Sequence, residues 1–156
     1  MADTRYGATA STLAQRFALA VGAVFLLVGI LGFVPGITTN LGDIEFAGHD
    51  SGAELLGIFQ VSVLHNIVHL LFGLIGLWAA RESAEVSTAY LIAGGVVYGV
   101  LALYGAVVDA TSDANFVPLN TADNWLHLVL AIGMVALGLV ARAELTPRAP
   151  GRARPA

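Results

Sequence analysis

The chain has 156 residues, of which 57% are hydrophobic and only 12% are charged, and its net charge is −4. Ordinary soluble domains are about 45–50% apolar and about 25% charged, so this composition favours a membrane protein built as one domain. The absence of cysteine from the sequence excludes disulfides, thiolate metal sites and thioether-attached haem. The sequence also lacks a basic patch of the kind that binds nucleic acid, so no nucleic-acid partner is expected.

Long apolar segments predict an all-α fold, a bundle of four transmembrane helices. We place the helices at about residues 12–34, 53–80, 86–108 and 124–141, within a transmembrane domain over residues 12–142. About 20 apolar residues cross a bilayer core, and each segment comes close to this length or exceeds it. The first segment ends at Pro35-Gly36 without the small residues of a signal-peptide cleavage site, so we expect it to be retained.

The two ends of the chain are predicted to lie outside the bundle. Residues 1–11 are small and polar and form an N-terminal tail. Residues 143–156 are rich in proline, arginine and alanine without an apolar period, which predicts a disordered basic tail.

The distribution of basic residues predicts the orientation. Loops 35–52 and 109–122 contain no Lys or Arg, whereas all seven arginines fall in the tails, at helix ends or in the connector after the second helix. By the positive-inside rule, both termini are then cytoplasmic. We therefore expect a multi-pass protein of the inner (plasma) membrane, with the lipid bilayer as its main partner.

A short motif occurs twice. Asn66-Ile-Val-His69-Leu70 in the second predicted helix matches Asn124-Trp-Leu-His127-Leu128 in the fourth. The first and third helices align more weakly, with residues 21–25 on residues 94–98 and Gly32 on Gly105. The pattern predicts two helical-hairpin repeats, residues 12–81 and 87–142, of parallel topology.

The repeated motif places polar side chains at membrane depth, where they are expensive and normally face a protein interior or a cavity. His65 and His69 are four residues apart and share one helix face, which Asn66 borders. One interpretation is a structural layer in which the Asn/His pairs join helices two and four by hydrogen bonds. The candidate ligand-binding residues are Gln60, His65, Asn66, His69, Asn124 and His127.

Two other interpretations give the histidines a chemical role. Histidines on neighbouring helices could ligate a b-type haem, and His65, His69 and His127 together could hold zinc or copper. Alternatively, the layer could line a quinone-like, small-molecule or proton site, to which Tyr98 and Tyr104 would contribute. No nucleophile triad or phosphate-binding loop is recognisable, so enzymatic activity is not favoured.

Several segments also carry a family resemblance. At Gly29–Gly36, and at Val63-Leu-His65-Asn66-Ile-Val-His69-Leu-Leu-Phe-Gly73, the sequence resembles a family of small four-helix bacterial membrane proteins, largely actinobacterial, catalogued as a domain of unknown function. The resemblance covers about residues 12–142. It implies four spans and directs attention to the histidines and asparagines, but it implies no reaction.

These observations lead to two expected functions. The first is a structural or accessory membrane component acting in a homo-oligomer or a larger membrane-protein complex. Its support is the Gly95–Gly99 spacing in the third helix, because small residues four apart let helices approach closely. The alternative is a redox or ligand-binding membrane protein that uses the histidines for haem, a metal or a quinone-like ligand.

Overall fold

The computed structural model describes residues 11–145, and four helices dominate it. They are α1 (Leu13–Leu31), α2 (Val63–Glu82), α3 (Ala84–Val107) and α4 (Thr121–Leu145). Each is long and apolar enough to cross a membrane, which makes the chain a multi-pass membrane protein. The all-α, four-helix prediction is confirmed. The predicted tails lie largely outside the described residues, except that residues 143–145 continue α4.

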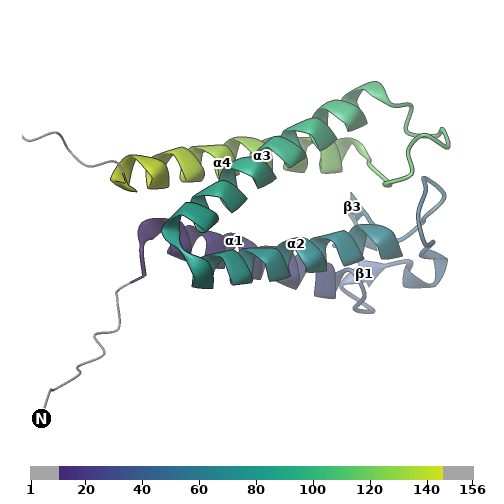
Figure 1. Ribbon diagram of the computed structural model, residues 1–156. Helices are drawn as coiled ribbons and strands as arrows, with labels where there is room; N and C mark the ends of the chain where they lie inside the picture. Colours follow the sequence, from purple (N-terminus) through teal and green to yellow (C-terminus); the bar gives the residue numbers. More distant parts are fainter. Residues whose placement is uncertain (1–10, 146–156) are drawn as a thin grey trace, which may run out of the picture.

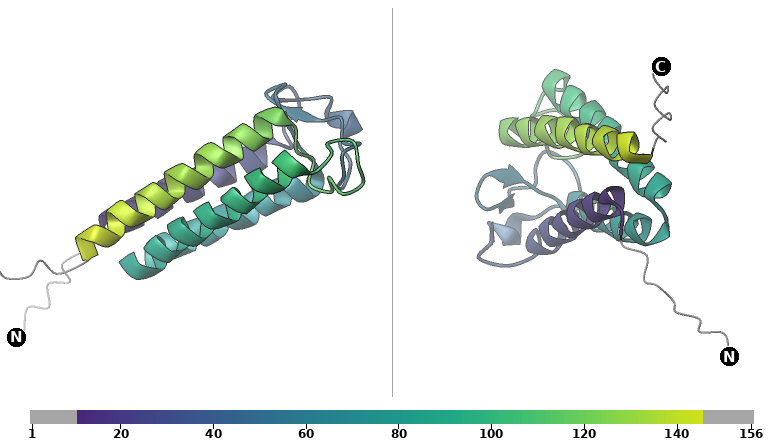
Figure 2. Two further views of the ribbon diagram at one scale, coloured as in Figure 1. Left: turned by 90° about the horizontal axis from the view of Figure 1, so that it is seen from above. Right: turned by 90° about the vertical axis from the view of Figure 1, so that its left-hand side faces the viewer.

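The helices form two hairpins, with α1 beside α2 and α3 beside α4 (Figure 1). The first and last described residues lie at the same end of the bundle as the α2–α3 connector (Figure 2). We call this the terminal end. The opposite end, which we call the loop end, carries the first connection (residues 32–62) and the second connection (residues 108–120).

The start of the second helix differs from the prediction. The expected helix from about residue 53 begins instead at Val63, and residues 53–62 form part of a small sheet. Strand β2 (Glu54–Leu55) pairs antiparallel with β1 (Thr38–Thr39) and with β3 (Phe59–Gln60), and the 3₁₀ turn η1 (Leu41–Asp43) follows β1. The reason lies in a local turn, since Leu56 and Gly57 both have positive φ, 57° and 67°, within the three-residue loop that joins β2 to β3.

Local capping fixes the helix ends at the other positions. Ser83 alone connects α2 to α3 and accepts a hydrogen bond from the Val86 amide, so the connector is shorter than predicted. Asn120 precedes α4, and its side chain accepts from the Asp123 amide at 3.0 Å while the Asp123 carboxylate accepts from the Asn120 amide. This reciprocal pair is a capping box, and it starts α4 three residues earlier than expected.

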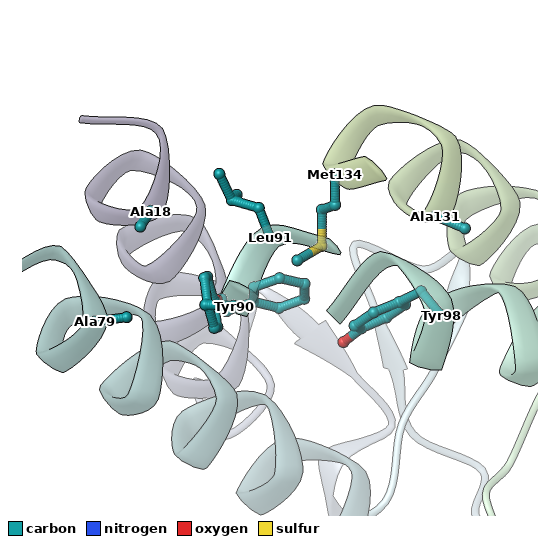
Figure 3. Close-up of a cluster of buried hydrophobic side chains, with 8 residues drawn as sticks. Ala18, Ala79, Tyr90, Leu91, Tyr98, Ala131 and Met134 are labelled. Carbon is teal, nitrogen blue, oxygen red and sulfur yellow. The ribbon is translucent and has the colours of Figure 1, made fainter. Parts of the chain in front are cut away.

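Small residues bring the helices together around a core shared by both hairpins (Figure 3). A Cβ added to Gly22 of α1 would lie 2.9 Å from the Gly73 carbonyl oxygen of α2. A Cβ added to Gly95 of α3 would lie 2.9 Å from the Ala131 carbonyl oxygen of α4. The buried core residues are Ala18, Phe25, Ala79, Tyr90, Leu91, Tyr98, Ala131 and Met134.

Large apolar side chains also cover the outside of the bundle. Leu27, Leu71, Val100 and Ile132, one from each helix, are all more than half exposed. A soluble protein rarely exposes contiguous apolar surface on this scale, whereas a bilayer covers it. The outer faces are therefore lipid-facing, and the histidines of α2 and α4 are buried inside the bundle.

Candidate functional site

Two asparagines fasten the helices of each hairpin to one another. The Asn66 side-chain amide on α2 donates to the Gly32 carbonyl at the end of α1, with an N–O distance of 2.9 Å. The Asn124 amide on α4 donates to the Gly105 carbonyl of α3 at the same distance. We call these two contacts the Asn–Gly clamps. They correct the prediction that the asparagines join helices two and four, since each acts inside its own hairpin.

The clamps have a clear physical cause. The last four carbonyls of a helix lack intrahelical partners, and Gly32 and Gly105 both lie at such helix ends. In a bilayer, water does not satisfy these groups, so a side chain from the neighbouring helix must do so. Glycine is needed because a Cβ at either position would overlap the asparagine amide. The side-chain nitrogens of both asparagines thus have a structural explanation, whereas their Oδ1 atoms are buried without a hydrogen-bond partner among residues 11–145.

The histidines come together between the hairpins. His65 and His69 stack on one face of α2 with ring centroids 4.6 Å apart, and His127 of α4 lies 6.1 Å from His65. All three side chains are buried. The three histidines therefore meet in the interior between the two hairpins.

Hydrogen bonding leaves part of this cluster unsatisfied. Nδ1 of His69 lies 3.1 Å from the His65 carbonyl oxygen, and because a carbonyl only accepts, this nitrogen carries the proton. Nε2 of His69 is then an acceptor. Nδ1 of His65 and Nδ1 of His127 are buried and have no hydrogen-bond partner among residues 11–145. Buried polar atoms are normally satisfied, so two orphaned imidazole nitrogens need an explanation.

Aromatic rings from the first helix of each hairpin pack on the histidines. Phe25 of α1 stacks on His69 at 5.7 Å, and Tyr98 of α3 makes an edge contact with His127 at 5.2 Å. Phe25 and Tyr98 also stack on each other at 5.2 Å. The rings fix the imidazoles on one side and connect them to the core in Figure 3.

On their other side the histidines face a cavity of about 110 Å³, which we call the chamber. It lies at the loop end, between α1, α2, α4 and the first connection. Residues 55–61, which the sequence assigned to a helix, close it as strands and turn. The chamber is lined by His65, His69, Asp123, His127 and the apolar residues Val28, Leu55, Leu56, Phe59, Val61 and Leu126.

Asp123 is a functional candidate that the sequence motifs did not single out, because an acid near a helix start is typical of a cap. Its side chain is only 2% exposed, and Oδ2 accepts from the backbone amides of Gln60 at 3.1 Å and Asn120 at 3.0 Å. A signal was present in the repeat, since Asp123 stands four residues before His127 as His65 stands four before His69.

Three of the six candidate residues do not line the chamber. The Gln60 side chain donates to the carbonyls of His49 and Ser51, at 2.9 and 2.8 Å, and so holds the first connection together. The Asn66 and Asn124 amides are engaged in the clamps. Tyr104, a further candidate, donates its hydroxyl to the Ala114 carbonyl in the second connection.

The size of the chamber limits what it can hold. Sites for drug-sized ligands measure about 300–1,000 Å³, so neither a haem nor a quinone ring fits a cavity of about 110 Å³. A water molecule takes up about 30 Å³ in the liquid, so the chamber suits a ligand of a few non-hydrogen atoms. Within the described part of the chain, no group of three or more His, Asp or Glu side chains is arranged to hold a metal ion.

Comparison with known proteins gives one match. The family model described as "Domain of unknown function (DUF4383)" matches residues 15–140, which is most of the chain. No curated protein and no solved structure matches the chain.

Proposed function

Given that the chain belongs to the DUF4383 family, which supplies no activity, we propose from its geometry that it is a membrane protein that binds a small polar ligand in the chamber. The observation that carries this proposal is the pair of orphaned Nδ1 atoms on His65 and His127. They lie on residues that line a cavity, and a polar guest there satisfies them once the ring turns the nitrogen toward it. Dry cavities in proteins are apolar, whereas a polar cavity of sufficient size holds water or a ligand.

The expected structural or accessory role in an oligomer or complex draws less support from the contacts. The asparagines are used in the clamps, and Gly95 faces Ala131 and Val135 of the same chain. The residues that suggested a partner thus make their contacts within the same chain. A structural polar layer remains the competing function, and the experiment below separates the two.

We also infer that the two hairpins are copies of one ancestral hairpin. The clamps pair Asn66 with Gly32 and Asn124 with Gly105, in the register of the sequence alignment. The aromatic contacts follow the same register, with Phe25 on His69 and Tyr98 on His127. Matching contacts at aligned positions support duplication more strongly than the short sequence match does.

For the location we propose the plasma membrane, with both termini in the cytoplasm. Arg16, Arg81 and Arg142 all belong to the terminal end, whereas the two connections contain no Lys or Arg. The positive-inside rule then places the loop end, and with it the chamber, toward the outside. A reporter enzyme that works only in the cytoplasm should be active when it is fused after Ala156. Activity of a reporter that works only in the periplasm would reverse the assigned orientation.

The binding function is tested with histidine-selective ¹⁵N NMR on the protein in lipid nanodiscs. Small polar probes of either charge, together with neutral ones, are titrated while the ring nitrogens are observed. We expect at least one probe to shift the His65 and His127 signals saturably. His49 is the internal control, since it lies in the first connection and pairs with Asp50 at 3.3 Å.

Matched variants locate the binding. His65→Phe and His127→Phe should abolish the saturable shift, whereas His49→Ala should leave it unchanged. If no probe saturates any chamber histidine, the structural role is correct. An absorbance spectrum and metal analysis of the same sample should show neither a Soret band nor stoichiometric metal, and either finding would contradict the proposal.

A further inference from the structure

Resting on the proposed function, we further propose that the chamber is selective for a small monocation that donates hydrogen bonds, of the ammonium type, bound in competition with a proton. Three features of the chamber support this selectivity, namely its charge, the hydrogen-bonding groups on its wall and its size.

When Asp123 is ionised, the chamber carries a negative charge. Asp123 is 2% exposed, and the two hydrogen bonds that Oδ2 accepts are of the kind that stabilises an ionised carboxylate. No Lys or Arg is among the residues that line the chamber. Glu54 on β2, which pairs with Gln60 in the sheet, adds negative charge near Asp123. A buried charge normally requires a partner, so a cation in the chamber completes the site.

The hydrogen-bonding groups on the wall are suited to a donor. Oδ1 of Asp123 accepts no hydrogen bond within residues 11–145, because both of the bonds to this carboxylate fall on Oδ2. Nε2 of His69 is an acceptor because Nδ1 donates to the His65 carbonyl. The orphaned Nδ1 atoms of His65 and His127 become acceptors when the proton sits on Nε2. An ammonium group has donors only, so it pairs with those of these acceptors that it reaches and places no second acceptor against them.

The size and arrangement of the wall exclude the main competitors. A cavity of about 110 Å³ accepts ammonium or methylammonium with a water molecule, but not an extended organic cation. Divalent transition metals are disfavoured because the described His, Asp and Glu side chains form no three-ligand group. Anions would face Asp123 and Glu54 without a cationic side chain on the chamber wall.

A proton competes for the same groups. The titratable side chains that face the chamber or its wall are His65 and His69 from α2, Asp123 and His127 from α4, Glu54 from β2 and Tyr98 from α3. The aromatic residue that α1 adds, Phe25, does not titrate. Protonation of Asp123 or of an imidazole removes the acceptor that the cation needs. Cation affinity should therefore fall as the pH is lowered, by up to about tenfold per pH unit if one proton is displaced.

The experiment titrates ammonium chloride and methylammonium chloride into the full-length protein in nanodiscs at constant ionic strength. We expect saturable shifts of the His65 and His127 ring nitrogens, with weaker binding at pH 5.5 than at pH 7.5. Sodium chloride, potassium chloride and tetramethylammonium chloride, whose cations donate no hydrogen bond, should give no saturable shift. Saturation by sodium or by tetramethylammonium would overturn the assignment to a hydrogen-bond donor.

Two variants and a matched control complete the test. Asp123→Asn preserves the acceptors of the capping box but removes the charge, and it should weaken ammonium binding about tenfold or more, the effect of losing a charged hydrogen bond. His127→Phe provides a second variant on the same wall, so the test does not depend on the folding of one protein. Asp113→Asn alters an exposed acid in the second connection and should leave binding unchanged.

The outcomes separate the two proposals. If acetate or formamide saturates the histidines and ammonium does not, the cation assignment is wrong and the proposed function stands. If no probe saturates them, both are wrong. If ammonium binds equally well to folded Asp123→Asn, the carboxylate is not the determinant and the cation assignment fails.

Discussion

The two hairpins are built alike but end differently at the loop end. Each has an Asn–Gly clamp, an aromatic ring on a histidine and small residues where its helices touch. They differ at the position four residues before that histidine, which is His65 in α2 and Asp123 in α4. The shared contacts hold helices together, whereas the differing residues both line the chamber.

The connections differ as well. The first connection forms the β1–β3 sheet, whose residues close the chamber, while the second is shorter and contributes none of the chamber residues. The second connection instead supports the first, since the Asn120 side-chain amide donates to the Ile58 carbonyl at 2.8 Å. The two hairpins therefore differ from each other where the chamber lies.

The largest effect is expected from filling the glycine positions of the clamps. Gly105→Ala and Gly32→Ala each place a Cβ on the asparagine amide and should destabilise the protein by about 3 kcal/mol, the upper range for overpacking. Thermal unfolding in detergent measures the change. Gly133→Ala in α4 is the control, because a Cβ there meets no atom within 4 Å, and it should be neutral or slightly stabilising.

Removing the clamp donors tests whether the hairpins are equally held. Asn66 is fully buried, whereas Asn124 is half-buried beside a lipid-facing groove. Asn66→Ala should therefore cost about 1–2 kcal/mol, and Asn124→Ala about 0.5–1 kcal/mol, within the range for hydrogen bonds between membrane helices. Unfolding in mixed micelles measures both. A larger loss in Asn124→Ala would show that the second clamp is the dominant one.

The residues that start α2 and α4 offer a smaller contrast. Ser62 accepts from the His65 amide only, whereas Asn120 caps α4 and also contacts Ile58. Ser62→Ala should cost about 1 kcal/mol as an ordinary N-cap loss, and Asn120→Ala about 1 kcal/mol more. Helical circular dichroism during thermal unfolding compares them. Equal losses would mean that the contact to Ile58 contributes nothing.

The smallest effect concerns the turn between β2 and β3. Leu56 has φ of 57°, which is costly for a branched side chain, and it is largely exposed. Leu56→Asn suits this turn and should stabilise the protein by about 1 kcal/mol. The shift of the thermal midpoint checks this, with Ile58→Asn as a control that lacks a positive φ. A lower midpoint in Leu56→Asn would show that the leucine contributes more through the chamber wall than it costs in the turn.

Features that depend on local composition and periodicity follow from the amino-acid sequence. Four apolar segments require four helices, and the spacing of His65 and His69 places them on one face whatever they pack against. The alignment of Gly32 with Gly105 also anticipated positions that the clamps use. These properties follow from helix geometry and the cost of polar groups in lipid, both of which act over a few residues.

Contacts between distant residues depend instead on how the helices and connections pack. The Asn66 amide donates to the Gly32 carbonyl, which lies 34 residues away in the sequence. The Asp123 carboxylate accepts from the Gln60 amide, which lies 63 residues away. The early part of the predicted second helix became strands because it pairs with β1 and closes the chamber. Apolar residues alone do not distinguish a buried strand from a helix turn, and an acid near a helix start reads as a cap. The burial of Asp123 beside three histidines exists only because two hairpins bring those residues together.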